Sequence, residues 1–188
     1  MIQAVIFDCF GVLYHGSLTH MLELTPPESR QKLLDINHAF DRGFVTRDEF
    51  IKEASELTGL HQSEVKRVMN ADHIRNQALL DYVLEIKKNY RTALLSNIGQ
   101  HVIDRLFQPE ELERYFDAVV LSSAVGMVKP YPEIYAYTAS RLHVAPNECI
   151  MIDDLYENID GAKAVGMQGI VYHTKPQLMV DLGRLLTK

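Results

Sequence analysis

Near its start the chain reads Ile2-Gln-Ala-Val-Ile-Phe7 and continues directly into Asp8-Cys-Phe10-Gly11. Residues 2–7 are almost continuously apolar, which is typical of a strand buried on both faces of a parallel sheet. Asp8 then stands at the carboxyl end of this predicted strand. Ligands bind at that end of the strands in an open parallel sheet, so the stretch indicates a functional position as well as a fold.

Four more short apolar stretches predict strands, at Thr92–Leu95, Ala118–Leu121, Cys149–Ile152 and Gly169–Tyr172. Helical patterns lie between or after them, at Val102–Phe107, Glu133–Leu142, Ile159–Val165 and Gln177–Leu186. Strands that alternate with helices are the signature of a doubly wound α/β fold, in which helices cover both faces of a parallel sheet. We therefore expect a Rossmann-like five-stranded parallel sheet.

Residues 15–89 break this alternation. They contain no convincing strand pattern but several amphipathic helical ones, and Thr46-Arg-Asp-Glu49 matches a capping box at a helix start. The sequence predicts an α/β core formed by residues 1–14 and 90–188, with residues 15–89 inserted as a helical cap. A length of 188 residues suits one domain that carries such an insertion.

The composition argues against some classes of binding partner. The formal net charge of −6 argues against nucleic acid or an anionic membrane surface as the main partner. Cys9 and Cys149 lie in apolar runs without a disulfide pattern, so we expect reduced thiols and a cytoplasmic protein. No apolar run approaches the ~20 residues that span a bilayer. The N-terminus lacks a basic leader, so we expect no signal peptide.

Polar residues follow the predicted strands and form a chemically coherent set: Asp8, Ser96, Asn97, Lys129, Asp153 and Asp154. Carboxylates that converge on one point repel one another unless a cation lies between them, and oxygen ligands suit Mg²⁺. Lys129 adds a second positive charge. Ser96 and Asn97 can donate hydrogen bonds to phosphoryl oxygens, and a carboxylate such as Asp8 can attack phosphorus to form an aspartyl phosphate.

Four segments carry a resemblance to a known family, and they read Val5-Ile-Phe-Asp8-Cys-Phe10-Gly-Val-Leu13, Leu95-Ser96-Asn97, Val128-Lys129-Pro130 and Met151-Ile-Asp153-Asp154-Leu-Tyr-Glu-Asn158-Ile-Asp-Gly161-Ala162. In this order they resemble the four motifs of the haloacid dehalogenase-like hydrolase superfamily. The resemblance covers the whole predicted core, and the helical insertion is similar to the cap of many members. The fourth segment is the most specific and is similar to that of small bacterial phosphatases related to sugar-phosphate phosphatases.

The resemblance implies catalytic roles for three residues. Asp8 would be the nucleophile, and Ser96 would bind the phosphate, with Asn97 binding beside it. Lys129 would stabilise both the nucleophile and the transferring phosphoryl group. The substrate would be a small phosphorylated metabolite.

The resemblance also implies a Mg²⁺ cofactor with ligands from two motifs. Asp8 and the main-chain carbonyl of Phe10 would supply ligands from the first motif. Asp154 would bind the metal directly, and Asp153 directly or through water. Asn158, one turn beyond Asp154, fits equally well a supporting contact to these carboxylates or plain helix surface.

Phe10 departs from the family pattern, because most phosphatases of this superfamily have an aspartate two residues after the nucleophile. That aspartate protonates the leaving oxygen, which is typically worth about 10²–10⁴-fold in rate. Sugar-1-phosphates and acyl phosphates, which have good leaving groups, therefore rank above simple alkyl esters as substrates. His15 and Tyr14 follow the motif closely and are candidates for a substitute proton donor.

Two alternatives remain open. The first alternative is a carbon–halogen hydrolase, in which Asp8 would attack carbon. Haloacid dehalogenases also lack the aspartate two residues after the nucleophile. Those enzymes are metal-independent, however, and the Asp153-Asp154 pair is the metal-binding form, which favours phosphate. The second alternative is a catalytically weak relative that binds a phosphorylated metabolite or a protein. Metal dependence distinguishes a phosphatase from the carbon–halogen hydrolase. Measurable turnover distinguishes a phosphatase from the relative that only binds its ligand.

Overall fold

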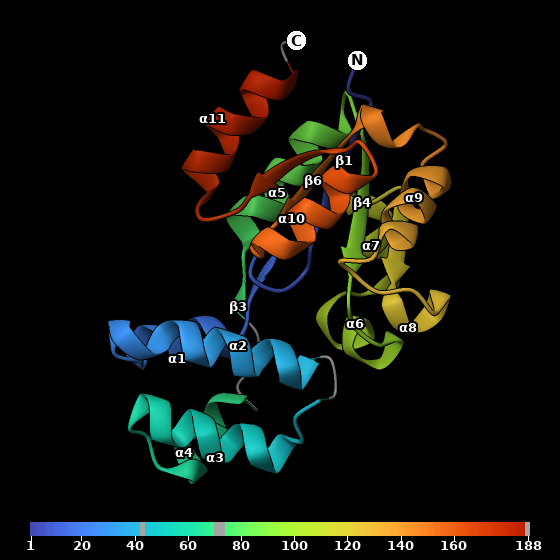
Figure 1. The fold of residues 1–188 in the computed structure, drawn as a ribbon. Coiled ribbons are helices and arrows are strands. Elements are labelled where there is room, and N and C mark those ends of the chain that lie inside the picture. Colours follow the sequence, from blue (N-terminus) through green and yellow to red (C-terminus); the bar gives the residue numbers. More distant parts are fainter. Residues whose placement is uncertain (42–43, 70–73, 187–188) are drawn as a thin grey trace. The chain divides into compact units, whose positions relative to one another are not determined.

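The apolar stretches form one five-stranded parallel sheet in the strand order β5-β4-β1-β6-β7, which confirms the predicted α/β fold. The strands are β1 (Ala4–Phe7), β4 (Arg91–Ser96), β5 (Ala118–Leu121), β6 (Cys149–Asp153) and β7 (Gln168–Val171). The computed structural model describes residues 1–41, 44–69 and 74–186 (Figure 1). In the central strand, Phe7 is in register with Leu94 of β4 and with Ile152 of β6.

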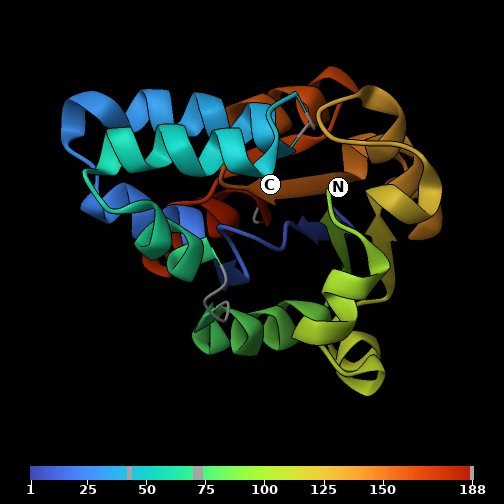
Figure 2. The ribbon, with the colours of Figure 1, turned by 90° about the horizontal axis from the view of Figure 1, so that it is seen from below.

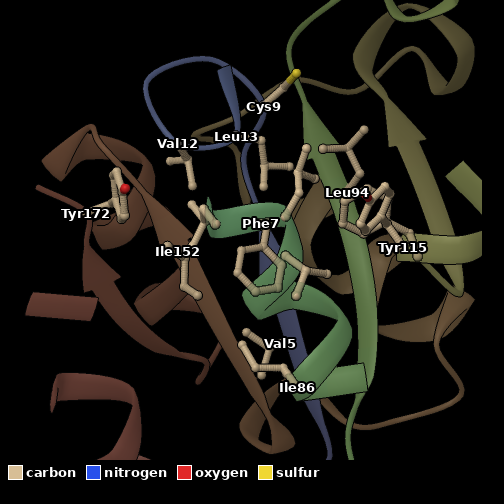
Figure 3. Packing of buried hydrophobic residues seen from close by; sticks show 14 of the residues in the cluster. Val5, Phe7, Cys9, Val12, Leu13, Ile86, Leu94, Tyr115, Ile152 and Tyr172 are labelled. Atoms are coloured by element: carbon tan, nitrogen blue, oxygen red, sulfur yellow. The ribbon is translucent and has the colours of Figure 1, made fainter. Parts of the chain in front are cut away.

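Successive residues of β1 point into different cores. Val5 and Phe7 belong to one buried apolar cluster, and Ala4 and Ile6 belong to another. The first cluster is completed by α5 (Gln77–Lys87), α6 (Gln100–Leu106), α7 (Pro109–Tyr115) and α11 (Lys175–Leu186), and Figure 3 shows Phe7 among its neighbours. The second is completed by α9 (Pro132–Arg141) and α10 (Tyr156–Ala164). Apolar cores on both faces explain why the strands are continuously hydrophobic.

The chain divides into two compact units, one of residues Met1–Tyr14 and Arg75–Lys188 and one of residues His15–Ile74. The second unit contains α1 (Ser17–Leu24), α2 (Arg30–Asp41), α3 (Arg47–Thr58) and α4 (Gln62–Met69), with α2 and α3 side by side in Figures 1 and 2. It has its own apolar core, which includes Met21, Leu33 and Phe50. The capping box of Thr46 and Glu49 is present at the start of α3, as the sequence predicts.

The second boundary of the insertion differs from the expected one. Residues 75–89 lie in the first unit, because α5 buries Leu79, Leu80 and Val83 in the first core cluster. The chain leaves the first unit through β2 (Tyr14–His15) and returns through β3 (Ile74–Arg75), and these form a two-stranded sheet. Strands of two residues are too short to show a sequence pattern. Within the described residues, no helix has the length and apolar character needed to cross a membrane.

Candidate active site

The site begins where β1 and β6 end next to each other. Asp8 follows the last residue of β1, and its N–H donates to the carbonyl of Ile152 at 2.9 Å. Asp153 is the last residue of β6. The ammonium of Lys129 lies between the two carboxylates, with Nζ 2.7 Å from Asp8 Oδ1 and 2.6 Å from Asp153 Oδ2. All three side chains are buried, so the structure brings together three residues that are far apart in the sequence.

Asp153 is held in place by α10 as well as by Lys129. The side-chain amide of Asn158 donates to both of its carboxylate oxygens, at 3.0 and 3.1 Å, and the N–H of Leu155 donates to Oδ1 at 2.9 Å. The hydroxyl of Tyr135 donates to the carbonyl of Asn158 at 2.6 Å. Both Asp153 oxygens therefore accept hydrogen bonds from the protein, which suits an orienting partner of Lys129 more than a direct metal ligand.

Asp154 completes a cluster of carboxylates. Asp8, Asp153 and Asp154 each offer an oxygen, and these oxygens lie within 4.8 Å of one another. The loop after β1 passes so close to Asp154 that a Cβ on Gly11 would lie 2.1 Å from Asp154 Oδ2. Gly11 has a φ of 82°, a left-handed conformation that favours glycine. Because glycine has no side chain, the Asp154 carboxylate can occupy its position in the cluster without a steric clash.

The charges of this cluster do not balance. Burial raises the pKa of Asp8 to about 6, against the lowering effect of Lys129, and the charge on Asp153 raises it further. Burial, and then the charges on Asp8 and Asp153, raise the pKa of Asp154 to about 8. Burial alone would lower the pKa of Lys129, but Asp153 and Asp8 together raise it, so this lysine stays charged. When all three carboxylates are ionised, they outnumber the one ammonium by two negative charges, which a divalent cation would balance.

These residues fit Mg²⁺ by ligand type. Mg²⁺ prefers carboxylate and carbonyl oxygens and is usually held by one or two carboxylates plus substrate phosphate and water. Asp8 and Asp154 are the candidate ligands. A cation bound there would favour the ionised form of both carboxylates.

Ser96 and Asn97 lie at the same edge of the sheet. Ser96 is the buried last residue of β4, which pairs directly with β1. The side chain of Asn97 hydrogen-bonds to the main chain of Lys129. Phosphate binding by Ser96 and Asn97 therefore remains a prediction, supported for Ser96 by its position in the sheet.

Phe10 packs against the first core cluster, and the role of its carbonyl as a metal ligand also remains a prediction. Tyr14 is buried, and its hydroxyl donates to the carbonyl of Leu106 at 2.5 Å. That hydrogen bond weakens its case as the substitute proton donor. The side chain of His15 lies outside the described part of the structure.

The comparison with known proteins agrees with this geometry. A family model described as haloacid dehalogenase-like hydrolase matches residues 2–166. The chain belongs to this family. The four segments quoted above therefore lie in a chain with the expected family membership and the expected fold.

Individual relatives of this haloacid dehalogenase-like hydrolase include sugar-phosphate phosphatases. D-ribitol-5-phosphate phosphatase of Bacteroides thetaiotaomicron is 29% identical over 189 residues, which cover 89% of this chain and 90% of that protein. A phosphorylated carbohydrates phosphatase of Thermotoga maritima is 30% identical over 64% of this chain and 56% of that protein. A family enzyme of Bacteroides thetaiotaomicron, solved with magnesium and inorganic phosphate, matches with a TM-score of 0.63 at 22% identity, covering 93% of this chain and 96% of that one.

Sequence reasoning missed or left open several supporting residues. Asn158 is buried and contacts Asp153, which decides between the two readings of this residue. The helical spacing after Asp153-Asp154 was a usable signal for it. Tyr135 and Gly11 gave no such signal, because their contacts to Asn158 and Asp154 depend on the packing of separate elements.

Proposed function

We propose that the protein is a Mg²⁺-dependent phosphatase that hydrolyses a small phosphomonoester, with sugar and polyol phosphates as the leading substrate class. The observation that carries the proposal is the buried Lys129 ammonium between Asp8 and Asp153, with Asp154 beside them. The cluster combines a nucleophile, a fixed cation and a place for a divalent cation. The named substrates of the two phosphatases above support the choice of substrate class.

In the proposed reaction Asp8 attacks phosphorus. An Asp8 oxygen forms a bond to phosphorus while the bond from phosphorus to the ester oxygen breaks, and the departing oxygen takes up a proton. Water then cleaves the aspartyl phosphate, which releases inorganic phosphate and restores Asp8. Lys129 holds Asp8 in position and offsets the negative charge of the phosphoryl group.

The residues around Asp8 have supporting roles in this proposal. Ser96 donates a hydrogen bond to a phosphoryl oxygen. Asp8 and Asp154 would hold Mg²⁺, which would offset the charge of the phosphate when bound. Asp153 and Asn158 keep the Lys129 ammonium directed at Asp8. The His15–Ile74 unit serves as the cap that selects substrates.

The proposal is tested by a screen of phosphomonoesters that includes ribitol 5-phosphate, fructose 1-phosphate and an aryl phosphate, with Mg²⁺ and with EDTA. We expect turnover of at least one compound with Mg²⁺ and its loss in EDTA. Asp8→Asn should abolish turnover without lowering the melting temperature. Asp160→Asn, a similar change at a side chain that is 75% exposed in α10, is the matched control and should retain full activity.

Two results would count against the proposal. Activity on a 2-haloacid that persists in EDTA would identify a carbon–halogen hydrolase. Absence of turnover on the whole panel, together with measurable binding of inorganic phosphate, would identify a binding relative without catalysis.

A further inference from the structure

Asn97 makes a paired contact with one residue of another loop. Its side-chain Nδ2 donates to the carbonyl of Lys129 at 3.0 Å, and the N–H of Lys129 donates to Asn97 Oδ1 at 2.9 Å. One amide side chain thus satisfies both main-chain polar groups of Lys129. The two residues are 32 positions apart in the sequence, so the contact joins the end of β4 to the loop before α9.

This loop needs such a contact because it carries Lys129 without regular secondary structure. The short helix α8 (Ser122–Val125) ends before it and α9 begins at Pro132. The ammonium of Lys129 must nevertheless stay within hydrogen-bond distance of both Asp8 and Asp153. A displacement of about 1 Å of a catalytic group can cost about 10²-fold in rate, so the anchoring of the main chain bears directly on the chemistry.

Helix α10 also lies close to this loop. A Cβ on Gly161 would lie 2.2 Å from the carbonyl oxygen of Pro130, so the helix approaches the loop main chain more closely than any other residue would allow. Within the loop, the N–H of Tyr131 donates to the carbonyl of Val128 at 3.1 Å. The Lys129 loop therefore contacts two other parts of the chain, through Asn97 directly after β4 and through Gly161 of α10.

We infer that the side chain of Asn97 is a positioning residue that sets the place of Lys129, and that it is not a phosphate ligand. The inference rests on the proposed function, in which Lys129 meets the phosphoryl group. It changes the role that the resemblance implies for this side chain, because both Oδ1 and Nδ2 are directed at the Lys129 main chain. Phosphate binding at this strand end then falls to the Ser96 hydroxyl and main-chain N–H groups.

The kinetic test compares two variants that disturb the loop through different contacts, with an aryl phosphate as substrate and inorganic phosphate as competing inhibitor. Asn97→Ala and Gly161→Ala should each lower kcat by at least about 10-fold with KM and the phosphate inhibition constant changed less than about 3-fold. The double variant should lose little more than either single one. Gly183→Ala, where a Cβ meets nothing within 4 Å, is the matched control and should keep wild-type kinetics.

A ligand role for the Asn97 side chain predicts a different pattern. Asn97→Ala would then raise KM and the phosphate inhibition constant together, and its loss would multiply with that of Gly161→Ala. Either result overturns the inference. If Asn97→Ala does not fold, Asn97→Asp replaces it, because it keeps the acceptor for the Lys129 N–H and removes the donor to the Lys129 carbonyl.

A structural test separates this inference from the proposed function. Crystal structures of the wild type and Asn97→Ala should show the Lys129 ammonium displaced from Asp8 or Asp153 in the variant. An unmoved ammonium would overturn the inference even if the wild type is an active phosphatase. If the ammonium is displaced in Asn97→Ala but the wild type shows no turnover, the positioning role is upheld and the proposed function is refuted.

Discussion

Phe10 lies two residues after Asp8, and its ring packs against the first core cluster. A phenyl ring cannot protonate a leaving oxygen, so we predict that rate depends steeply on the pKa of the leaving group. An aryl phosphate should be cleaved at least about 10²-fold faster than a primary alkyl phosphate. Phe10→Asp should raise the alkyl rate selectively, by about 10-fold or more, which steady-state kinetics on both substrates will measure.

Phe10→Leu is the control for this prediction, because it keeps an apolar side chain and adds no carboxylate. It should leave the ratio of aryl to alkyl rates unchanged. The opposite outcome is a shallow dependence on the leaving group in the wild type, with Phe10→Asp only lowering the melting temperature. A selective loss of alkyl activity in His15→Ala would then assign the proton donor to His15.

At this same scale, the sequence predicted the central residues of the site but not their supports. Asp8, Asp153 and Asp154 were predictable together because they stand at the carboxyl ends of two strands of one parallel sheet, and such ends meet at one edge. Lys129 lies beyond α8, and its loop was predicted from the order of the motif-like segments. The hydrogen bonds of Asn97 to Lys129 were not predictable. They depend on the path of a loop that has no periodicity, and an asparagine after a strand also suits a turn.

At the scale of elements, the loop after β1 requires a glycine at residue 11. Gly11→Ala places a Cβ in a left-handed conformation and against the Asp154 carboxylate. We predict a loss of about 1–2 kcal/mol in the free energy of unfolding from the backbone alone. Displacement of Asp154 should in addition weaken Mg²⁺ binding by about 10–100-fold. Isothermal titration with Mg²⁺ and thermal unfolding in EDTA measure the two effects separately.

Gly126→Ala is the control that measures the effect of backbone strain alone, without displacement of the Asp154 carboxylate. Gly126 has a φ of 67°, and a Cβ there meets nothing within 4 Å. This variant should lose a similar free energy of unfolding and keep wild-type Mg²⁺ affinity. Equal Mg²⁺ affinity in the two variants would show that Gly11 serves the turn alone.

The sequence pattern predicts the strand boundaries well but does not assign helix α5 to the correct unit. The boundaries of the strands in the five-stranded sheet were predicted within one residue, because a buried strand is a run of apolar residues bounded by polar ones. The exception is β1, which begins at Ala4 rather than Ile2. Helix α5 was placed in the insertion, since its amphipathic pattern resembles that of the helices before it. Only its tertiary contacts, through Leu79, Leu80 and Val83, assign it to the α/β unit.

At the scale of the whole molecule, the sequence predicts the fold class but not the charge balance at the candidate site. The fold class follows from the order of strands and helices and needed no distances. The deficit of positive charge at the site did not follow from the net charge of −6, which sums over the entire surface. It follows from the convergence of three carboxylates on one ammonium, and burial then raises the pKa values of Asp8 and Asp154.

That deficit links the stability of the whole molecule to pH and to Mg²⁺. The pKa of Asp8 is raised from 3.8 to about 6 and that of Asp154 from 3.8 to about 8, mainly by burial. Between these limits the metal-free folded protein binds protons that the unfolded chain has released, so its free energy of unfolding falls as pH rises. The raised pKa of Lys129 does not oppose this, because its stabilising contribution is lost only above its ordinary value of 10.5.

Mg²⁺ binds the ionised carboxylates, so it should reverse this trend. We predict that in EDTA the melting temperature falls between about pH 5 and about pH 8, and that the increase produced by Mg²⁺ is larger at the higher pH. Asp154→Asn should reduce the pH dependence in EDTA and remove most of the response to Mg²⁺, while Asp160→Asn should behave as the wild type. Thermal unfolding of the three proteins across this pH range, with and without Mg²⁺, provides the measurement. An Asp154→Asn protein that keeps the wild-type response to both pH and Mg²⁺ would place the cation elsewhere, because Asp154 carries the largest raised carboxylate pKa of the cluster.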